Sequence, residues 1–436
     1  MKIKKYFTTI NIIEGLIIAL FLSAFIYIEH FNLIDGYFLL IINSLNAIIG
    51  LYLLIKAKTP VWFFAGFFIG VFWLWWLGVS FYYYNLTYLI PFVILSIGLI
   101  YGLIFLLLAY ISKLISIKIE NYFLGIFWEK SRIILNAFML ILLNFFEPFG
   151  FNWLKLELIF VDSIFCIKIY CFIAIIFIIA ITILTKRWYL ILFLIFLLDF
   201  KTPKVLKPNT LKYIELVSTN INVKEKWNPK NQIKYTKLAL KKIDKAIAKG
   251  KKLVILPESI LPYFLNLETP YLNELKKLSF KIKIVIGSLY FKSQGNYRNS
   301  AYIIDNGKYK IANKVVLVPF GEVNPLPSFM GKIVNKIFFD GAVDYKADNN
   351  FTYINVLNKR FKIAICYEGT HPKTFEDKPK FLIVISNNGW FKPSIEPTLQ
   401  KILMKYFVRL YKSTIYHSIN GSPSYIIIPH PEVKDE

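Results

Sequence analysis

The stretch "RFKIAICYE", Arg360–Glu368, decides the fold of the second half of this 436-residue chain. The apolar run Phe361–Ile365 predicts a buried strand, and Cys366, a tyrosine and a glutamate follow it directly. A buried free cysteine is usually inert core, but a cysteine at the end of a strand can also be a nucleophile. The surrounding sequence must therefore decide between these two interpretations of Cys366.

The stretches around this strand predict an α/β domain. Tyr213–Thr219 alternates between apolar and polar residues as a strand does, and Gln232–Gly250 has helical spacing with a glycine suited to a helix C-cap. Further strands are predicted in "KLVILPES", "IKIVIGSLY", "SAYIIDNGKYKIANK" and "KFLIVISNNGW". Alternating strands and helices, followed by a run of strands, predict an α/β sandwich.

Polar side chains follow several of these strands at the point where each strand ends. They are Glu258 after Leu253–Leu256, Cys366 after Phe361–Ile365, and Asn387 with Asn388 after Phe381–Ser386. Lys314 lies between the strand-like segments Tyr309–Ala312 and Leu317–Val318. Ligands bind at the carboxyl ends of strands in open α/β sheets, so we expect Glu258, Lys314 and Cys366 to be candidate site residues.

The first 200 residues predict a multi-span α-helical membrane domain. Apolar segments there can be compared with the roughly 20 residues that cross a bilayer. The segments are Ile10–Ile28, Tyr37–Ile55, Val61–Tyr83, Leu86–Ile111, Ile133–Phe146, Phe165–Leu184 and Tyr189–Phe200. The fifth and the seventh are short. We therefore predict about seven spans.

The distribution of lysine and arginine predicts the orientation of these spans. Positive charges gather at alternate ends, at Lys2, Lys4 and Lys5, at Lys56 and Lys58, at Lys113, Lys118, Lys130 and Arg132, and at Lys186 and Arg187. The intervening loops are poor in them, apart from Lys155. Because basic loops stay in the cytoplasm, the N-terminus is expected inside and the domain after Phe200 outside.

Composition excludes some other classes of protein. The net charge is +25, but the basic residues are scattered and form no arginine-rich or aromatic-interleaved patch, so no nucleic-acid partner is expected. The three cysteines do not make a disulfide framework, and Cys366 is expected to be unpaired. The four histidines have no metal-ligand spacing, so no metal is expected.

The aromatic-rich stretch Phe67–Tyr84 predicts an interfacial belt with glycine-mediated helix packing, and specific lipid binding is the alternative.

Three motifs carry a resemblance to a known family. The stretches "LPES", "KVVLVPFGEVNPLP" and "ICYEGTHP" resemble the carbon–nitrogen hydrolase (nitrilase) superfamily, whose sites use glutamate, lysine and cysteine. Together with the membrane-spanning half, the chain resembles the apolipoprotein N-acyltransferase family. The resemblance implies a transmembrane helical domain over residues 1–203 and a nitrilase-like αββα catalytic domain over residues 204–436. It also implies a bacterial inner membrane location, with the catalytic domain on the periplasmic side.

The resemblance also assigns roles to residues of this chain. The base falls on Glu258, the lysine on Lys314 and the nucleophile on Cys366. Supporting roles fall on Glu322, Tyr367 and Glu368, and the functionally important tryptophan of the family falls on Trp227, expected to bind substrate. No cofactor is implied.

The implied reaction is a two-step acyl transfer. The cysteine takes an acyl chain from a membrane phospholipid and holds it as a thioester. The acyl chain then passes to the α-amino group of the lipid-modified N-terminal cysteine of an apolipoprotein. A membrane-anchored nitrilase or amidase acting on a small amide and a non-catalytic membrane scaffold remain alternatives. The apolar stretch Pro325–Gly341 is either a helix packed on the core or a mobile lid for acyl chains. Family members usually carry a last membrane helix beyond Asn420–Gly421, so a C-terminally short catalytic domain is expected here.

Overall fold

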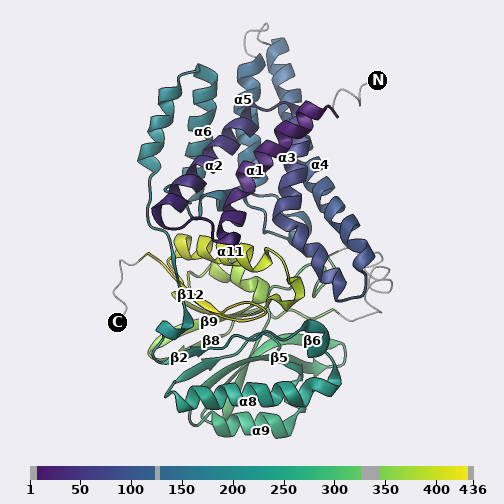
Figure 1. Ribbon diagram of the computed structural model, residues 1–436, viewed down its shortest axis with the longest axis vertical. Helices are drawn as coiled ribbons and strands as arrows, with labels where there is room; N and C mark the ends of the chain where they lie inside the picture. Colours follow the sequence, from purple (N-terminus) through teal and green to yellow (C-terminus); the bar gives the residue numbers. More distant parts are fainter. Residues whose placement is uncertain (1–6, 123–127, 326–343, 431–436) are drawn as a thin grey trace. The chain divides into compact units, whose positions relative to one another are not determined.

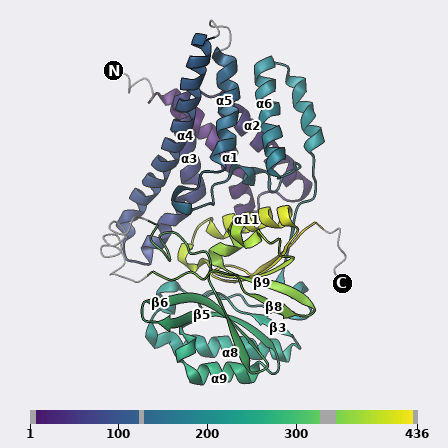
Figure 2. The same ribbon diagram turned by 180° about the vertical axis from the view of Figure 1, so that it is seen from behind.

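The computed structural model describes residues 7–122, 128–325 and 344–430 (Figures 1 and 2). The chain divides into two compact units. The first, called here the helical unit, comprises Met1–Glu147, Asn152–Thr202 and Pro393–Ile402. The second, called here the sheet unit, comprises Pro148–Phe151, Pro203–Lys392 and Leu403–Glu436. Each unit therefore includes a short piece of chain that is remote in sequence from its main part.

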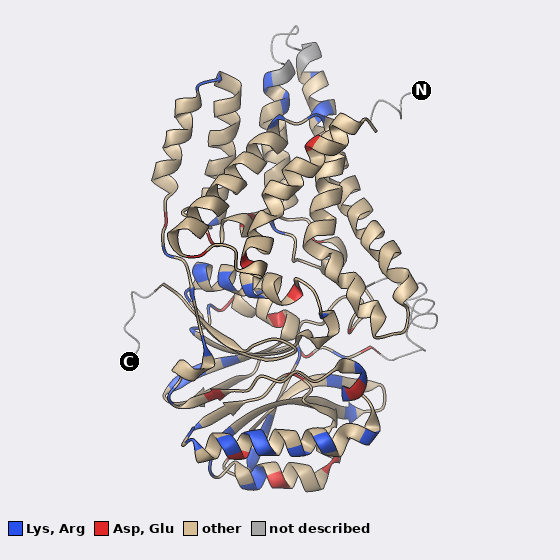
Figure 3. Cartoon of the chain, viewed as in Figure 1, with Lys and Arg blue, Asp and Glu red and all other residues tan. Residues whose placement is uncertain are grey.

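Apolar helices make up the helical unit. Among the described residues, five helices are long and apolar enough to cross a membrane: Thr9–Phe31, Gly36–Lys56, Thr59–Tyr82, Thr87–Ile119 and Lys130–Gly150. They overlap with α1 (Thr9–Phe31), α2 (Gly36–Lys56), α3 (Thr59–Leu74), α4 (Ile90–Tyr122) and α5 (Trp128–Leu143). Two shorter apolar helices, α6 (Ile169–Thr185) and η6 (Trp188–Leu197), lie in the sixth and seventh predicted segments. Figure 3 shows few charged residues along these helices. A membrane domain is thus confirmed, and seven crossings stay a prediction.

A glycine lets α3 and α4 approach closely. A Cβ added at Gly66 would lie 2.6 Å from Cγ of Phe105 and 2.7 Å from the carbonyl oxygen of Tyr101, closer than real Cβ atoms come. Small residues allow this kind of backbone approach between membrane helices, where packing replaces the hydrophobic effect as the source of affinity. The glycine-mediated helix packing predicted for this region is confirmed.

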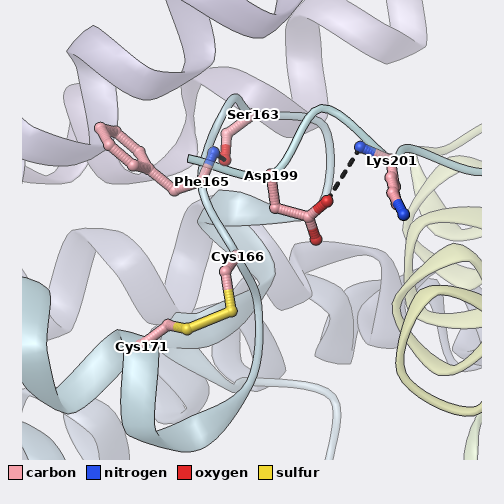
Figure 4. The surroundings of a disulfide bond; sticks show 6 residues. All are labelled: Ser163, Phe165, Cys166, Cys171, Asp199 and Lys201. Atoms are coloured by element: carbon pink, nitrogen blue, oxygen red, sulfur yellow. Dashed lines mark hydrogen bonds between the residues drawn. A yellow bond between two sulfur atoms is a disulfide. The ribbon is translucent and has the colours of Figure 1, made fainter. Parts of the chain in front are cut away.

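A disulfide joins Cys166 to Cys171 at the start of α6 (Figure 4). The N–H of Cys166 donates to the carbonyl of Leu197 at 2.9 Å, and the N–H of Asp199 donates to the carbonyl of Ile164 at 2.8 Å. The bond therefore lies where the chain entering α6 pairs with the chain leaving η6. The sequence did not predict it, because two cysteines five residues apart in an apolar run suit core packing equally well. Cys366 forms no disulfide with the other two cysteines.

Two six-stranded sheets form the centre of the sheet unit. The first has the order β1-β12-β11-β10-β9-β8, and the second has the order β2-β3-β5-β6-β7 with β4 pairing β5. The strands of the first are β1 (Lys204–Leu206), β8 (Tyr353–Val356), β9 (Lys359–Ile365), β10 (Phe381–Asn387), β11 (Thr414–Asn420) and β12 (Tyr425–Ile428). Those of the second are β2 (Ile214–Leu216), β3 (Leu253–Ile255), β4 (Leu261–Phe264), β5 (Lys283–Ser293), β6 (Asn296–Asp305) and β7 (Lys308–Asn313).

The two sheets pack face to face through alternate residues of their strands. Ile363 and Ile365 of the first sheet share one buried cluster with Ile255 and Val285 of the second. On its other face the second sheet is covered by α8 (Gln232–Ala248) and α9 (Thr269–Leu278), which bury Ile243 and Leu275 against it. Several basic residues occur along α8 (Figure 3), and most of its lysines are exposed. This layering follows from strand residues pointing alternately to the two faces of a sheet.

The two sheets and the layer of α8 and α9 are joined by a fourth layer. It is the end of α11 (Glu396–Tyr411), whose last residues belong to the sheet unit. There the ring of Phe407 stacks on that of Phe375 with their centroids 4.5 Å apart. The predicted α/β sandwich is confirmed. One predicted strand is wrong: Leu317–Val318 belongs to an irregular turn after β7, because its N–H groups and those next to it bond to glutamate side chains instead of a neighbouring strand.

Candidate active site

The site residues meet where strands end. Strands β9, β10 and β11 run parallel, with Ile365 opposite Ile385 and Asn387 opposite Asn420. The carboxyl ends of these strands therefore lie at one edge of the sheet. Cys366 follows β9 directly, and the side-chain amides of Asn387 and Asn420 lie 2.7 Å apart. The edge predicted from sequence thus exists and carries Cys366.

Cys366 has an unusual backbone. Its φ angle is 54°, in the left-handed region that residues with a side chain seldom occupy. A short 3-10 turn, Cys366–Thr370, begins at this residue, and the cysteine side chain is only half-buried. Left-handed residues other than glycine cost about 1–3 kcal/mol and cluster at functional sites. The combination of strain, a thiol in no disulfide and partial exposure favours a nucleophile over core filling.

Glu368 holds this turn from inside the protein. Its carboxylate is 1% exposed and accepts three backbone hydrogen bonds, from Val315 at 2.6 Å, Val316 at 3.0 Å and Ile365 at 2.6 Å. Burial raises the pKa of Glu368 to about 7, against the lowering effects of Lys314 and these N–H groups. Glu368 therefore ties the turn that carries Cys366 to the segment that follows Lys314.

An amide links the two glutamates of the site. The side-chain Nδ2 of Asn299 donates to Oε1 of Glu258 at 2.7 Å and to Oε1 of Glu322 at 2.8 Å. Glu322 also accepts the N–H of Val318 at 2.9 Å and forms an ion pair with Lys314 Nζ at 2.7 Å. The structure thus brings Glu258 into one hydrogen-bonded network with Glu322 and Lys314, although Glu258 is remote from both in sequence.

Lys314 is a permanent buried cation. Its side chain is 1% exposed, and it follows directly after β7. Burial alone lowers the pKa of Lys314, but the Glu322 carboxylate, the Cys366 thiolate and the Glu258 carboxylate together raise it well above its usual value. Because these three groups act on one ammonium, Cys366 shares its electrostatic environment with both glutamates. A fixed positive charge beside a thiolate stabilises it and any oxyanion that forms nearby.

Strand β5 determines where Glu258 can lie. A Cβ added at Gly287 would lie 2.5 Å from the carbonyl oxygen of Pro257, 2.5 Å from the N of Ser259 and 2.6 Å from Cα of Glu258. Only glycine allows the backbone around Glu258 to approach the strand this closely. Ser259 has a left-handed φ of 46°. Glu258 is therefore positioned by a tight backbone contact rather than by a flexible loop.

Tyr367 faces a remote piece of chain. Its ring is 3% exposed and stacks on the ring of Phe151, with centroids 5.9 Å apart and an angle of 8° between the planes. Its hydroxyl donates to the carbonyl of Gly150 at 3.2 Å. In the same segment, the ring of Phe149 packs edge-on against that of Phe320, with their centroids 5.4 Å apart. Tyr367, the residue after Cys366, thus anchors Pro148–Phe151, a segment of the sheet unit.

The sequence missed two residues of this network. One is Asn299, which lies in the middle of β6 with no local feature to distinguish it. The other is Lys226, the residue before Trp227, whose Nζ donates to the backbone carbonyl of Glu258 at 2.9 Å. Trp227 is half-buried, and its indole N–H has no hydrogen-bond partner among the described residues. Of this pair it is Lys226 that contacts the site residues through a polar group.

Two other expectations concern metals and the lid. Within residues 7–122, 128–325 and 344–430, no group of three or more His, Cys, Asp or Glu residues could hold a metal ion. The stretch Pro325–Gly341, interpreted as a packed helix or a lid, lies outside the described residues except for its first proline.

Comparisons with known proteins cover both units. Residues 9–202 match the family model for the apolipoprotein N-acyltransferase integral membrane domain, and residues 222–406 match the carbon-nitrogen hydrolase model. Among solved structures, an amidase from Nesterenkonia sp. matches with 12% sequence identity and a TM-score of 0.36. The match covers 51% of this chain and 91% of the amidase chain.

Full-length relatives are more similar. The apolipoprotein N-acyltransferase of Wolinella succinogenes is 36% identical over 94% of both chains. The enzyme of the same name from Helicobacter pylori is 35% identical, and the match covers 91% of this chain and 89% of the relative. The one from Campylobacter jejuni is 34% identical, and the match covers 96% of this chain and 90% of the relative. These matches run through both the helical unit and the sheet unit. The chain belongs to the apolipoprotein N-acyltransferase family.

Proposed function

We propose that this chain moves an acyl chain from a membrane phospholipid to the α-amino group of the lipid-modified N-terminal cysteine of an apolipoprotein. A thioester on Cys366 carries the acyl chain between the two substrates. The observation that carries the proposal is the half-buried thiol of Cys366, which is in no disulfide and lies in a strained turn beside the Glu258–Asn299–Glu322–Lys314 network. Family membership supports it, because the relatives named above carry the same activity in their names.

In the first step Cys366 attacks the ester carbonyl of the phospholipid. Glu258 accepts the thiol proton as the carbon–sulfur bond forms, and the oxyanion lies near the ammonium of Lys314. The ester carbon–oxygen bond then breaks. The lysophospholipid alkoxide takes the proton from Glu258, directly or with help from Glu322, and leaves. The products are a thioester and a lysophospholipid with a free hydroxyl group.

In the second step the α-amino group of the apolipoprotein attacks the thioester. Glu258 accepts the proton that the attacking nitrogen loses, and the carbon–sulfur bond breaks as the amide forms. Lys314 stabilises the departing thiolate of Cys366, which regains its proton from Glu258. Because both substrates are anchored in a bilayer, the fusion of such a site to membrane helices has a physical reason.

The whole reaction is expected in one assay. Protein in nanodiscs that contain phospholipid with a labelled acyl chain should form a labelled thioester that hydroxylamine releases. Addition of a diacylglyceryl-modified lipopeptide should then move the label to the peptide as an amide. Transfer of label to the peptide without any thioester would contradict the two-step proposal. An identical lipopeptide with an acetylated α-amino group is the matched control and should accept no label.

We further propose that the protein lies in the bacterial inner membrane with the sheet unit on the periplasmic side. Lysines and arginines at alternate ends of the helices support this orientation. The disulfide between Cys166 and Cys171 supports it, because disulfides persist in oxidising compartments such as the periplasm. The packing of Phe151 on Tyr367 supports it too, since it puts the loop after α5 with the sheet unit.

Single-cysteine labelling tests this orientation. In a background without the native cysteines, Lys241→Cys on the exposed face of α8 is expected to react with a membrane-impermeant maleimide in intact spheroplasts. Lys58→Cys, exposed between α2 and α3, should react only after the membrane is permeabilised. The reverse pattern would overturn the proposed topology. The pair is matched because each replaces one exposed lysine.

A further inference from the structure

Lys226 is a lysine with no exposed surface. It ends the short helix α7 (Val223–Lys226), and its exposure is 0%, whereas Lys224 and Glu225 in the same turn are exposed. Lysine is almost never fully buried unless its charge is compensated, because desolvating an ammonium group is costly. The site around it must therefore supply the compensation.

The contacts of Lys226 all lead to the candidate site. Its Nζ donates to the backbone carbonyl of Glu258 at 2.9 Å. With its amide oriented to satisfy its neighbours, Asn387 accepts from the same Nζ at 3.2 Å and from Trp390 Nε1 at 3.3 Å. These contacts join α7, the residues after β3 and the end of β10.

The compensating charges are those of the reacting groups. Among the described residues, no carboxylate forms an ion pair with Lys226. Burial lowers the pKa of Lys226 to about 8, and attraction to the Glu258 carboxylate and the Cys366 thiolate opposes that fall. Within the described part of the chain, Glu258 and Cys366 are the charged groups that act on Lys226.

The charges of the network show why a second cation is needed. Asn299 holds the carboxylates of Glu258 and Glu322 close together, and Lys314 is in contact with Glu322 at 2.7 Å. One ammonium therefore serves two carboxylates before any thiolate forms. Like charges in one buried site disfavour ionisation of each other, and an additional cation reverses that effect.

We propose that Lys226 is a positioning residue of this site, which holds the Glu258 backbone by a hydrogen bond and supplies a positive charge that stabilises the thiolate that Cys366 becomes when Glu258 takes its proton. The role rests on the proposed acyl transfer and deepens it. Lys314 acts on the oxyanion, whereas Lys226 acts through the base. The two lysines thus differ in what their loss should change.

Removing the charge of Lys226 should change the pH dependence of Cys366 in one direction. Without it, the thiolate of Cys366 is less favoured, so the pH at which the thiol becomes reactive should rise. An opposite charge a few ångströms away typically shifts such an equilibrium by about 1–3 pH units. The parent should in turn lose part of this effect above about pH 8, where Lys226 itself loses its proton.

The test is the pH dependence of alkylation at Cys366 by iodoacetamide, measured on the full chain in detergent by mass spectrometry of the Cys366 peptide. Lys226→Gln keeps an N–H donor for the Glu258 carbonyl but removes the charge, and Lys226→Met removes both. Lys224→Gln, in the same turn and exposed, is the matched control. The measurement needs no lipid substrate.

The midpoint of the alkylation profile is expected to rise by about one pH unit or more in Lys226→Gln and to stay unchanged in Lys224→Gln. An unchanged midpoint in Lys226→Gln, even with a lower rate at every pH, would overturn the proposal, because it would indicate a structural role alone. Lys226→Gln decides the question even when Lys226→Met does not fold. If the parent shows the expected profile but never forms a thioester, the acyl-transfer proposal fails and the role of Lys226 in ionising the site stands.

Discussion

Cys366→Ala is expected to form no thioester with labelled phospholipid and to lower acyl transfer to a lipopeptide by roughly 10⁴-fold or more. The reason is that alanine has no group that can carry the acyl chain. The variant should still fold and insert, because the turn is held by Glu368 through three backbone hydrogen bonds rather than by the half-buried thiol. A gel-shift assay with a thiol-reactive polymer, together with thermal unfolding, measures both properties.

Two variants make this result specific. Cys366→Ser should trap little or no acyl chain, since an alcohol is a much poorer nucleophile than a thiolate at neutral pH. The double variant Cys166→Ser with Cys171→Ser keeps Cys366 and removes the other two thiols, so its acylation signal should persist. Normal acyl transfer by Cys366→Ala would remove Cys366 from the mechanism.

Glu258→Gln is expected to slow acylation of Cys366 and transfer from it by about 10² to 10⁴, the usual contribution of a general base. Glutamine cannot accept the thiol proton. Its side chain can still bond to Asn299, which now contacts Oε1 of Glu258 at 2.7 Å, so the network should survive. Stopped incubation with labelled phospholipid, followed by the gel shift, should show almost no thioester in this variant.

Glu322→Gln is the matched comparison and should behave differently. It loses the carboxylate that pairs with Lys314 at 2.7 Å, but it leaves the proposed base in place. Some thioester should therefore accumulate with phospholipid alone. Because the Glu322 carboxylate is the largest cause that raises the pKa of Lys314 against burial, the remaining acylation should fall further at alkaline pH.

Two outcomes would contradict this division of roles. Acylation of Glu258→Gln at the parent rate would show that Glu258 is not the base. Equal loss of thioester in both variants would remove the distinction between Glu258 and Glu322, although Glu258, Lys314 and Cys366 could still act together. Thermal unfolding of each variant separates a failed reaction from a failed fold.

The sequence by itself determined the local structure of this protein. Long apolar runs predicted the membrane helices, because a bilayer admits only segments of sufficient length and low polarity. Strand and helix periods predicted the α/β sandwich, because each period places apolar side chains on one face. Polar residues after predicted strands marked Glu258 and Cys366, because the carboxyl ends of parallel strands share one edge of a sheet.

The tertiary structure alone decided how these residues act on one another. Asn299 reaches Glu258 and Glu322 across 41 and 23 residues of sequence, and Lys226 reaches Glu258 across 32. Nothing local distinguishes Lys226 from the exposed Lys224 two residues earlier. Burial of an ammonium group depends on which segments pack over it, and the free energy of a buried charge depends on every charge around it. Such quantities belong to the folded chain, because they arise only when distant segments exclude water from the same place.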